Sequence, residues 1–211
     1  MQSMRTSWNE NHAVLRGTAA AEPVFSHTNH GVDFFLFPLT VPRLSGAEDR
    51  INVVAPAPLL EGSPLSPGGW VEVTGEVRTF NNRTGPGSRL VITLLARTLA
   101  ETEEPPCNQL TLTGVLCKPP ILRRTPLGRE ICDLMLAVNR RYGRADYLPC
   151  IAWGALAQQC AGLTVGDGVA LEGRLQSRIY QKVIDGVTQE RTAFEVSVTT
   201  LSTPAPEAVS G

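Results

Sequence analysis

Aromatic and basic side chains gather in the second half of this chain, in a pattern that suits contact with single-stranded nucleic acid. Aromatic rings stack on exposed bases whatever the sequence, and each stack contributes about 1–3 kcal/mol by alanine substitution. Arginine and lysine neutralise phosphates, which adds affinity without sequence preference. Positions 174, 178, 180 and 182 differ by even steps, so a regular strand would point them to one face. The aromatic candidates are Tyr142, Tyr147, Trp153 and Tyr180, and the basic ones are Arg124, Arg129, Arg140, Arg141, Arg144, Arg174, Arg178 and Lys182.

The same residue types have a simpler explanation, in which the rings belong to a core and the arginines to solvated faces. The clustering of the whole set favours a binding surface. Motifs of catalysis are missing: the sequence contains no P-loop, no G-x-S-x-G and no H-E-x-x-H. His27 and His30 lie in a predicted loop without a cysteine or carboxylate at metal-ligand spacing. We therefore expect no catalytic residue, no metal, no cofactor and no enzymatic activity.

Charge is distributed unevenly over the 211 residues. The net charge is −1, but residues 1–104 have a balance of −3 and residues 105–211 a balance of +2. A surface for a polyanion is therefore expected in the second half. The five cysteines are odd in number and form no C-x-x-C, so reduced thiols are expected. No apolar run reaches membrane-spanning length and the N-terminus has no apolar signal, which predicts a soluble, cytoplasmic protein with no membrane partner.

An internal repeat divides the chain into two related halves. An ordered series of pairs in one register is difficult to explain by chance, and we interpret it as a tandem duplication. The predicted domains are residues 1–104, with a core at about 12–100, and residues 105–211, with a core at about 109–201. Charged residues and prolines at 101–106 suit the linker between them. The pairs are Gly17 and Gly114, Gly31 and Gly128, and Asp49 and Asp146, each 97 residues apart, and Gly75 and Gly173, 98 apart.

Strand signals dominate both halves. Apolar and polar residues alternate at 71–77, 110–116 and 194–201, and 131–138 suits a strand over a barrel. Asp185-Gly186 predicts a hairpin turn, and 154–162 predicts a short helix. Three strands, a helix and two strands is the order of an OB-fold. The predicted fold is therefore all-β, with two tandem five-stranded OB barrels, the second with a helix between strands 3 and 4. In the first half, three prolines within 55–64 argue against a regular helix.

Residues 110–201 resemble the DNA-binding domain of bacterial single-stranded DNA-binding proteins (the SSB family). The resemblance rests on motifs that span the second half in order: Leu112-Thr-Gly-Val-Leu, Thr125-Pro-Leu-Gly128, Leu136-Ala-Val-Asn-Arg-Arg-Tyr142, Trp153-Gly-Ala-Leu-Ala157 and Leu171-Glu-Gly-Arg-Leu-Gln-Ser-Arg-Ile-Tyr180. It implies that Tyr142, Tyr147, Trp153 and Tyr180 stack on bases of single-stranded DNA.

The first half resembles the same family more faintly. Ala55 stands where the family pattern would place the counterpart of Trp153, and Asn82 stands near the counterpart of Tyr180. This half is expected to be a weaker DNA surface, or a domain repurposed for pairing. Its weaker candidates for DNA contact are Arg43, Arg78, Phe80 and Arg83.

The resemblance implies a protein of the bacterial cytoplasm, associated with the nucleoid, that binds single-stranded DNA with little sequence specificity in replication, recombination or repair. Four OB domains per particle would make it a homodimer, by analogy. Two alternatives stay open: an OB module that mainly binds protein, such as a primosome or mobile-element accessory protein, and a binder of single-stranded RNA. The stretch 202–211 is expected to be a short disordered tail. It holds one acidic residue, so recruitment of partners through an acidic tip is not expected.

Overall fold

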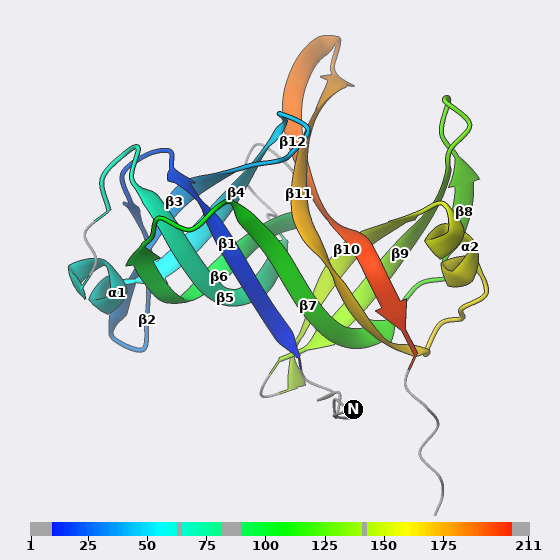
Figure 1. Ribbon diagram of the computed structural model, residues 1–211, viewed down its shortest axis with the longest axis horizontal. Helices are drawn as coiled ribbons and strands as arrows, with labels where there is room; N and C mark the ends of the chain where they lie inside the picture. The colour runs from blue at the N-terminus through cyan, green and yellow to red at the C-terminus, as the bar shows by residue number, and fades with distance from the viewer. Residues whose placement is uncertain (1–9, 63–64, 82–89, 141–142, 204–211) are drawn as a thin grey trace, which may run out of the picture. The chain divides into compact units, whose positions relative to one another are not determined.

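The computed structural model describes residues 10–62, 65–81, 90–140 and 143–203, and most of them are in strands (Figure 1). Residues 1–9, 63–64, 82–89, 141–142 and 204–211 lie outside this description. The chain divides into two compact units. The N-terminal unit contains His12–Leu110 and Arg174–Glu195. The C-terminal unit is built around Thr111–Gly173, with the segment that begins at Val196.

The first barrel consists of the strands of the N-terminal half. The strand order is β2-β3-β4-β6-β5-β1, and β3 also pairs with β1, which closes the barrel and leaves β2 at an edge. All pairs with a known register are antiparallel except β4 with β6. The elements are β1 (Asn11–Ala19), β2 (Val24–Asn29), β3 (Val32–Pro42), β4 (Glu48–Pro56), α1 (Ala57–Gly62), β5 (Trp70–Asn81) and β6 (Leu90–Glu101).

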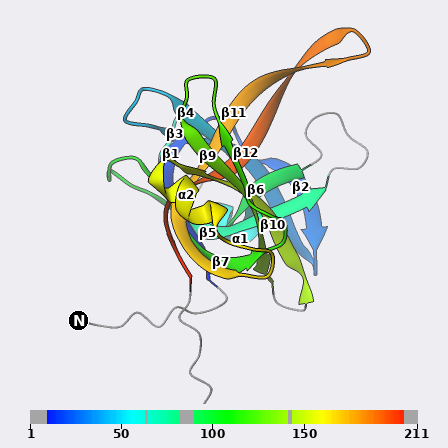
Figure 2. The ribbon, with the colours of Figure 1, turned by 90° about the vertical axis from the view of Figure 1, so that its right-hand side faces the viewer.

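The second barrel repeats this topology. Its order is β7-β11-β12-β10-β9-β8, with a further pairing of β7 and β9, and β10 is parallel to β12. Helix α2 packs against β8, β9 and β10 (Figure 2). The elements are β7 (Cys107–Leu116), β8 (Ile121–Arg124), β9 (Glu130–Asn139), β10 (Ala145–Trp153), α2 (Ala155–Ala161), β11 (Gly168–Ile184) and β12 (Val187–Ser202). The predicted fold of two OB barrels is confirmed, and β2 and β8 are short strands that the sequence analysis did not predict.

One expectation about the first barrel is wrong. The prolines at 55–64 argued against a regular helix, but α1 spans Ala57–Gly62. Pro58 is the second residue of this helix. There its missing N–H has no partner in the helix to lose, and the ring meets no preceding turn. A proline near the start of a helix therefore does not exclude it.

The repeat reappears as two pairs of close backbone approaches. A Cβ at Gly17 would collide with the carbonyl oxygen of Thr40, and a Cβ at Gly114 would collide with that of Ala137. Thr40 and Ala137 are themselves 97 residues apart. Gly75 and Gly173 meet Leu95 and Ser197 in the same way. Glycine is needed at these four sites, which we call the crossing glycines, because a backbone carbonyl of another strand lies too close to leave room for a Cβ.

Strands β11 and β12 are the longest of the molecule and continue into a hairpin, drawn in orange in Figure 1. Its tip is Asp185-Gly186, with φ of 50° and 78°, which confirms the predicted turn. We call Arg174–Glu195 the arm. Because the arm groups with the N-terminal unit, the compact units do not follow a single cut in the sequence. The domain limits 1–104 and 105–211 stay a prediction.

The helices are short, with six residues in α1 and seven in α2. Within the described ranges, no helix has the length and apolar character needed to cross a membrane.

Candidate nucleic-acid interface

Strand β10 places two of the predicted aromatic residues on one face. Leu148, Cys150 and Ala152 are buried and point to the core, so the odd-numbered residues lie on the opposite, outer face, where Ile151 is covered but Tyr147 and Trp153 are not. Tyr147 is 51% exposed and Trp153 is 40% exposed, both on this outer face. Six residues of strand separate them by about 20 Å. The barrel thus presents two large rings to solvent at opposite ends of one rigid strand.

The neighbouring strand β9 shapes the surroundings of these rings. Tyr147 pairs with Ala137, which has a small side chain, and Trp153 pairs with Ile131. Arg123 of β8 also pairs with Ile131 and forms a bidentate ion pair with Asp133. Arg123 therefore lies on the same outer face of the sheet as Trp153. Arg123 was not among the predicted contact residues, although it directly precedes Arg124.

Arg124 occupies the opposite face of the sheet. It forms an ion pair with Glu130 at 3.1 Å, and the other oxygen of Glu130 accepts a hydrogen bond from Gln158 of α2. These two hydrogen bonds lower the pKa of the Glu130 carboxyl. Since Arg124 and Arg123 alternate along β8, Arg124 faces the helix side and Arg123 the outer side. The structure does not bring Arg124 together with Trp153.

Arg140 is engaged by a buried carboxylate. Asp146 is fully buried, and its two oxygens accept hydrogen bonds from Nε and Nη2 of Arg140, the former at 2.5 Å. The same pair recurs in the first barrel, where Arg43 donates to Asp49 and the hydrogen bond raises the pKa of the Arg43 guanidinium. Both arginines hold buried carboxylates in place, so a contact of either with phosphate stays a prediction. Arg129 and Arg144 are exposed in turns.

The arm carries the remaining predicted residues of the second half. The Arg178 guanidinium carbon lies 5.8 Å from the centre of the Tyr180 ring, within reach of a cation–π interaction, so these two side chains share a face as the even spacing predicts. Arg178 and Lys182 are exposed and Tyr180 is half-buried. Arg174 is held at the base of the arm by a hydrogen bond of 3.4 Å to Gln176. Tyr142, Arg141 and Arg83 lie outside the described residues.

The first barrel carries different side chains at the places of the two rings. Register identifies them: Arg50 pairs with Thr40 as Tyr147 pairs with Ala137, and Pro56 pairs with Phe34 as Trp153 pairs with Ile131. The assignment of Ala55 to the Trp153 place is therefore wrong by one residue. Ala55 is fully buried and corresponds to Ala152. Arg50 is exposed, and the 97-residue offset would have found it.

Of the weaker candidates of the first barrel, Arg78 and Phe80 lie on β5, and Arg43 directly follows β3. Arg78 forms an ion pair with Glu76, which also pairs with Arg97 at 2.9 Å. Phe80 is 54% exposed near the end of β5. Arg43 is bound to Asp49, as described above.

Aromatic side chains of the β2–β3 hairpin form a group that the sequence analysis did not single out. Phe25, 60% exposed, meets Phe35 edge-on at 6.1 Å, and His27 stacks on Phe34 at 5.0 Å with the rings nearly parallel. Residues 20–37 contain no lysine or arginine. In the sequence, the three phenylalanines within residues 34–37 were the signal that could have indicated this group. Rings without cations suit contact with protein better than with a polyanion.

Comparison with known proteins gives consistent matches. Residues 107–203 match the Single-strand binding protein family. Single-stranded DNA-binding protein B of Bacillus subtilis is 37% identical over 81 residues, which are 35% of this chain and 72% of that protein. Single-stranded DNA-binding protein 2 of Listeria innocua is 36% identical over 81 residues, 35% of this chain and 51% of that protein. The chain spans about half the length of most curated relatives that it matches.

Solved structures extend the similarity to nearly the whole chain. The wild-type single-stranded DNA binding protein from Thermus aquaticus is 24% identical with a TM-score of 0.78, over 97% of this chain and 98% of that one. A deletion mutant of that protein is 25% identical with a TM-score of 0.75, over 94% and 96%. The fold of both halves is therefore shared with these structures.

Proposed function

The chain belongs to the single-strand binding protein family, and on this premise we propose that it binds single-stranded DNA with little sequence preference, in replication, recombination or repair. The observation that carries the proposal is the outer face of β10, where Tyr147 and Trp153 stand exposed on a strand of a closed barrel. A role in binding rather than catalysis and a place in the bacterial cytoplasm belong to the same proposal.

Stacking and charge would act together on the strand. Tyr147 and Trp153 stack on bases, and Tyr180, with Arg178 beside its ring, adds a third platform on the arm. The exposed cations Arg129, Arg144 and Lys182 approach phosphates, so affinity falls with salt. None of these groups reads a base edge in a defined pattern, which supports weak sequence preference.

The direct test is a titration with oligo-dT, followed by intrinsic fluorescence at low and high salt. Quenching should saturate, weaken as salt rises, and drop strongly in Trp153→Ala. Trp70→Phe is the matched control, because Trp70 donates its ring N–H to the Glu104 carbonyl in the N-terminal unit and is not proposed to stack. Absence of binding by the wild-type protein at micromolar concentration in low salt would overturn the proposal.

A parallel titration with oligo-U distinguishes DNA from RNA. Stacking is indifferent to the sugar, so a preference must come from contacts with the 2′-hydroxyl. We expect tighter binding to oligo-dT. Equal or tighter binding to oligo-U would favour the RNA-binding alternative.

The edge strand β2 favours a role in pairing for the first barrel. All six residues of β2 are exposed, they carry no charge, and Val24 and Phe25 present apolar surface at 59% and 60% exposure. An uncharged edge is a template for strand addition. We propose that it contributes to a homodimer with four OB barrels. Sedimentation equilibrium tests this: wild type should be dimeric and Phe25→Lys should dissociate more readily, whereas a monomeric wild type would refute the dimer.

A further inference from the structure

Residues of the N-terminal unit bind the base of the arm through hydrogen bonds at two alternate positions of β11. The first is Leu175, whose N–H donates to Oδ1 of Asn108 at 2.9 Å and whose carbonyl accepts from Nδ2 of Asn108 at 2.7 Å. One side-chain amide thus satisfies both backbone groups of Leu175, as a neighbouring strand would.

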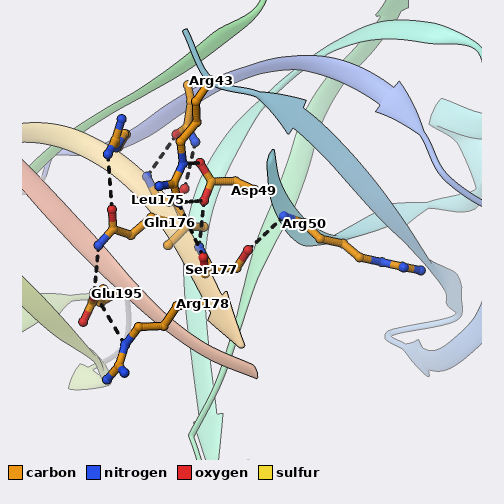
Figure 3. A network of polar contacts seen from close by, with 10 residues as sticks. Arg43, Asp49, Arg50, Leu175, Gln176, Ser177, Arg178 and Glu195 are labelled. Atoms are coloured by element: carbon orange, nitrogen blue, oxygen red, sulfur yellow. Dashed lines mark hydrogen bonds and ion pairs between the residues drawn. The ribbon is translucent and has the colours of Figure 1, made fainter. Parts of the chain in front are cut away.

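The second position is Ser177, which is bound through its N–H, its hydroxyl and its carbonyl (Figure 3). Its N–H donates to Oδ1 of Asp49 at 2.9 Å, and its Oγ accepts from the Arg50 N–H at 2.9 Å. A terminal nitrogen of Arg43 lies 3.5 Å from its carbonyl oxygen. Asp49 is only 1% exposed and is held in turn by both Arg43 hydrogen bonds. The turn between β3 and β4, together with the first residues of β4, therefore binds Ser177 through all three of these groups.

Two fixed points on alternate residues determine the direction of a strand. Leu175 and Ser177 are separated by about 6–7 Å along β11 and use the same edge of it. The hydrogen bond to a buried carboxylate is charge-assisted and stronger than a neutral one. Arg178 and Tyr180 follow within three residues of Ser177, so the grip orients the part of the arm that bears them.

A second set of contacts stiffens the other side of this base. The Gln176 amide, only 9% exposed, donates to Glu195 of β12 at 2.7 Å and accepts from Arg174 at 3.4 Å. Arg178 lies 3.9 Å from the same Glu195 oxygen. Figure 3 shows Gln176, Glu195 and Arg178 on one side of β11, and Asp49 with Ser177 on the other.

We propose that Asp49 and Asn108 are positioning residues for nucleic-acid binding: they hold the arm so that Arg178 and Tyr180 meet the strand in a fixed geometry. This inference rests on the proposed function. It gives the N-terminal unit a part in affinity that does not require stacking rings on β4. A rigid arm needs no ordering when the ligand binds, and preorganisation of this kind raises affinity without adding a contact.

The test measures oligo-dT affinity for Asp49→Asn, Tyr180→Ala and their combination. Tyr180→Ala should weaken binding by about 5- to 150-fold, the value of one lost stack. Asp49→Asn should weaken it by about 3- to 10-fold, and the combination should be little worse than Tyr180→Ala alone, because both changes act through the same ring. Glu72→Gln is the control: it removes the ion pair with Arg16 in the same barrel and should leave affinity unchanged.

Two further measurements separate positioning from unfolding. Asn108→Ala releases Leu175 while leaving Asp49 with Arg43, and it should weaken oligo-dT binding in the same non-additive way. Hydrogen exchange of the Leu175 and Ser177 amides, measured without DNA, should accelerate in both variants while the amides of β5 stay protected. Unchanged affinity in Asp49→Asn and Asn108→Ala, or losses that simply add to that of Tyr180→Ala, would overturn the inference.

Failure of the proposed function would look different. If the wild-type protein does not bind oligo-dT at all, the proposal of single-stranded DNA binding falls, and the positioning role falls with it. If the wild-type protein binds oligo-dT and the Asp49→Asn and Asn108→Ala variants bind it equally well, the positioning role alone is refuted.

Discussion

Strand β10 of the second barrel and strand β4 of the first occupy equivalent places, yet their outer faces differ. Where β10 presents Tyr147 and Trp153, β4 presents Arg50 and Pro56. The inner framework has changed much less: each barrel keeps its crossing glycines and a buried aspartate bound to an arginine. The comparison teaches that closing the barrel constrains buried positions, whereas outward positions are free to diverge after a duplication.

The edge strands extend the same comparison. Strand β8 is lined by two ion pairs, Arg123 with Asp133 and Arg124 with Glu130. Its counterpart β2 carries no charge and bears Phe25 instead. Charges on an edge oppose strand addition, and their absence permits it. The second barrel thus presents two exposed rings on β10 and carries charges at its edge, while the first barrel is poor in exposed rings on β4 and has an uncharged edge.

The largest expected difference between the barrels concerns DNA affinity. Replacing Tyr147 and Trp153 together by alanine should cost about 1–3 kcal/mol of binding free energy for each ring. Arg50→Ala in the first barrel should cost less and should act mainly by reducing the salt dependence by about one phosphate contact. Oligo-dT titration over a series of salt concentrations measures both. Equal losses from the two changes would contradict the division of roles.

The crossing glycines should behave alike in the two barrels. Gly75→Ala and Gly173→Ala each push a Cβ into a backbone carbonyl, of Leu95 and Ser197 respectively, and should lower the free energy of unfolding by about 1–3 kcal/mol. Gly62→Ala is the control, since its Cβ would meet open space. Urea denaturation gives the values. If Gly75→Ala were as harmless as Gly62→Ala, the shared framework would be wrong.

Alkaline pH should weaken the second barrel selectively. Burial raises the pKa of Cys160 on α2 from 9.0 to about 11, and burial also raises the pKa of Cys132 on β9. Below pH 9.0 both thiols are protonated in the folded and the unfolded chain, so their stabilising contribution is complete. As pH rises towards 11, the unfolded chain loses the protons first and the stability falls, by about 1–2 kcal/mol.

Hydrogen exchange of amides in each barrel, at pH values below 9.0 and near 11, measures this effect. The counterpart of Cys132 in the first barrel is Phe35, which does not titrate. The Cys160→Ala variant should lose part of the pH dependence. A decline of equal size in the first barrel, or one that Cys160→Ala leaves intact, would show that these thiols are not the cause.

The smallest effect is expected at the edges. Arg123→Gln and Arg124→Gln together should cost about 0.2–1 kcal/mol of stability, since both ion pairs are exposed. They should also increase self-association, because they remove charges that oppose the addition of another strand to the edge of β8. Val24→Lys on β2 should have the opposite influence on association. Sedimentation velocity compares the variants. If all of them self-associate to the same extent, edge charge does not control association.

Much of the fold was predictable because its signals are local. Alternation at 71–77, 110–116 and 194–201 predicted strands that lie in β5, β7 and β12, Asp185-Gly186 predicted the tip of the arm, and 154–162 predicted α2. The prolines led to a wrong prediction at α1. The effect of a proline depends on its position within a helix, and the sequence alone does not give the residue at which this helix begins. Tyr147 and Trp153 were predicted from their places at the start and end of an expected strand and from the family resemblance, and both are exposed. Arg123 and Arg50 were recognised from strand register.

The sequence by itself determined the duplication, the barrels and the two rings of β10, because periodicity and turn chemistry act between residues close in the chain. Only the tertiary structure showed that Arg140 and Arg43 form ion pairs with buried carboxylates, and that Asp49 accepts a hydrogen bond from Ser177, 128 residues away. Such pairings depend on which strands meet when a barrel closes, and no local pattern encodes them.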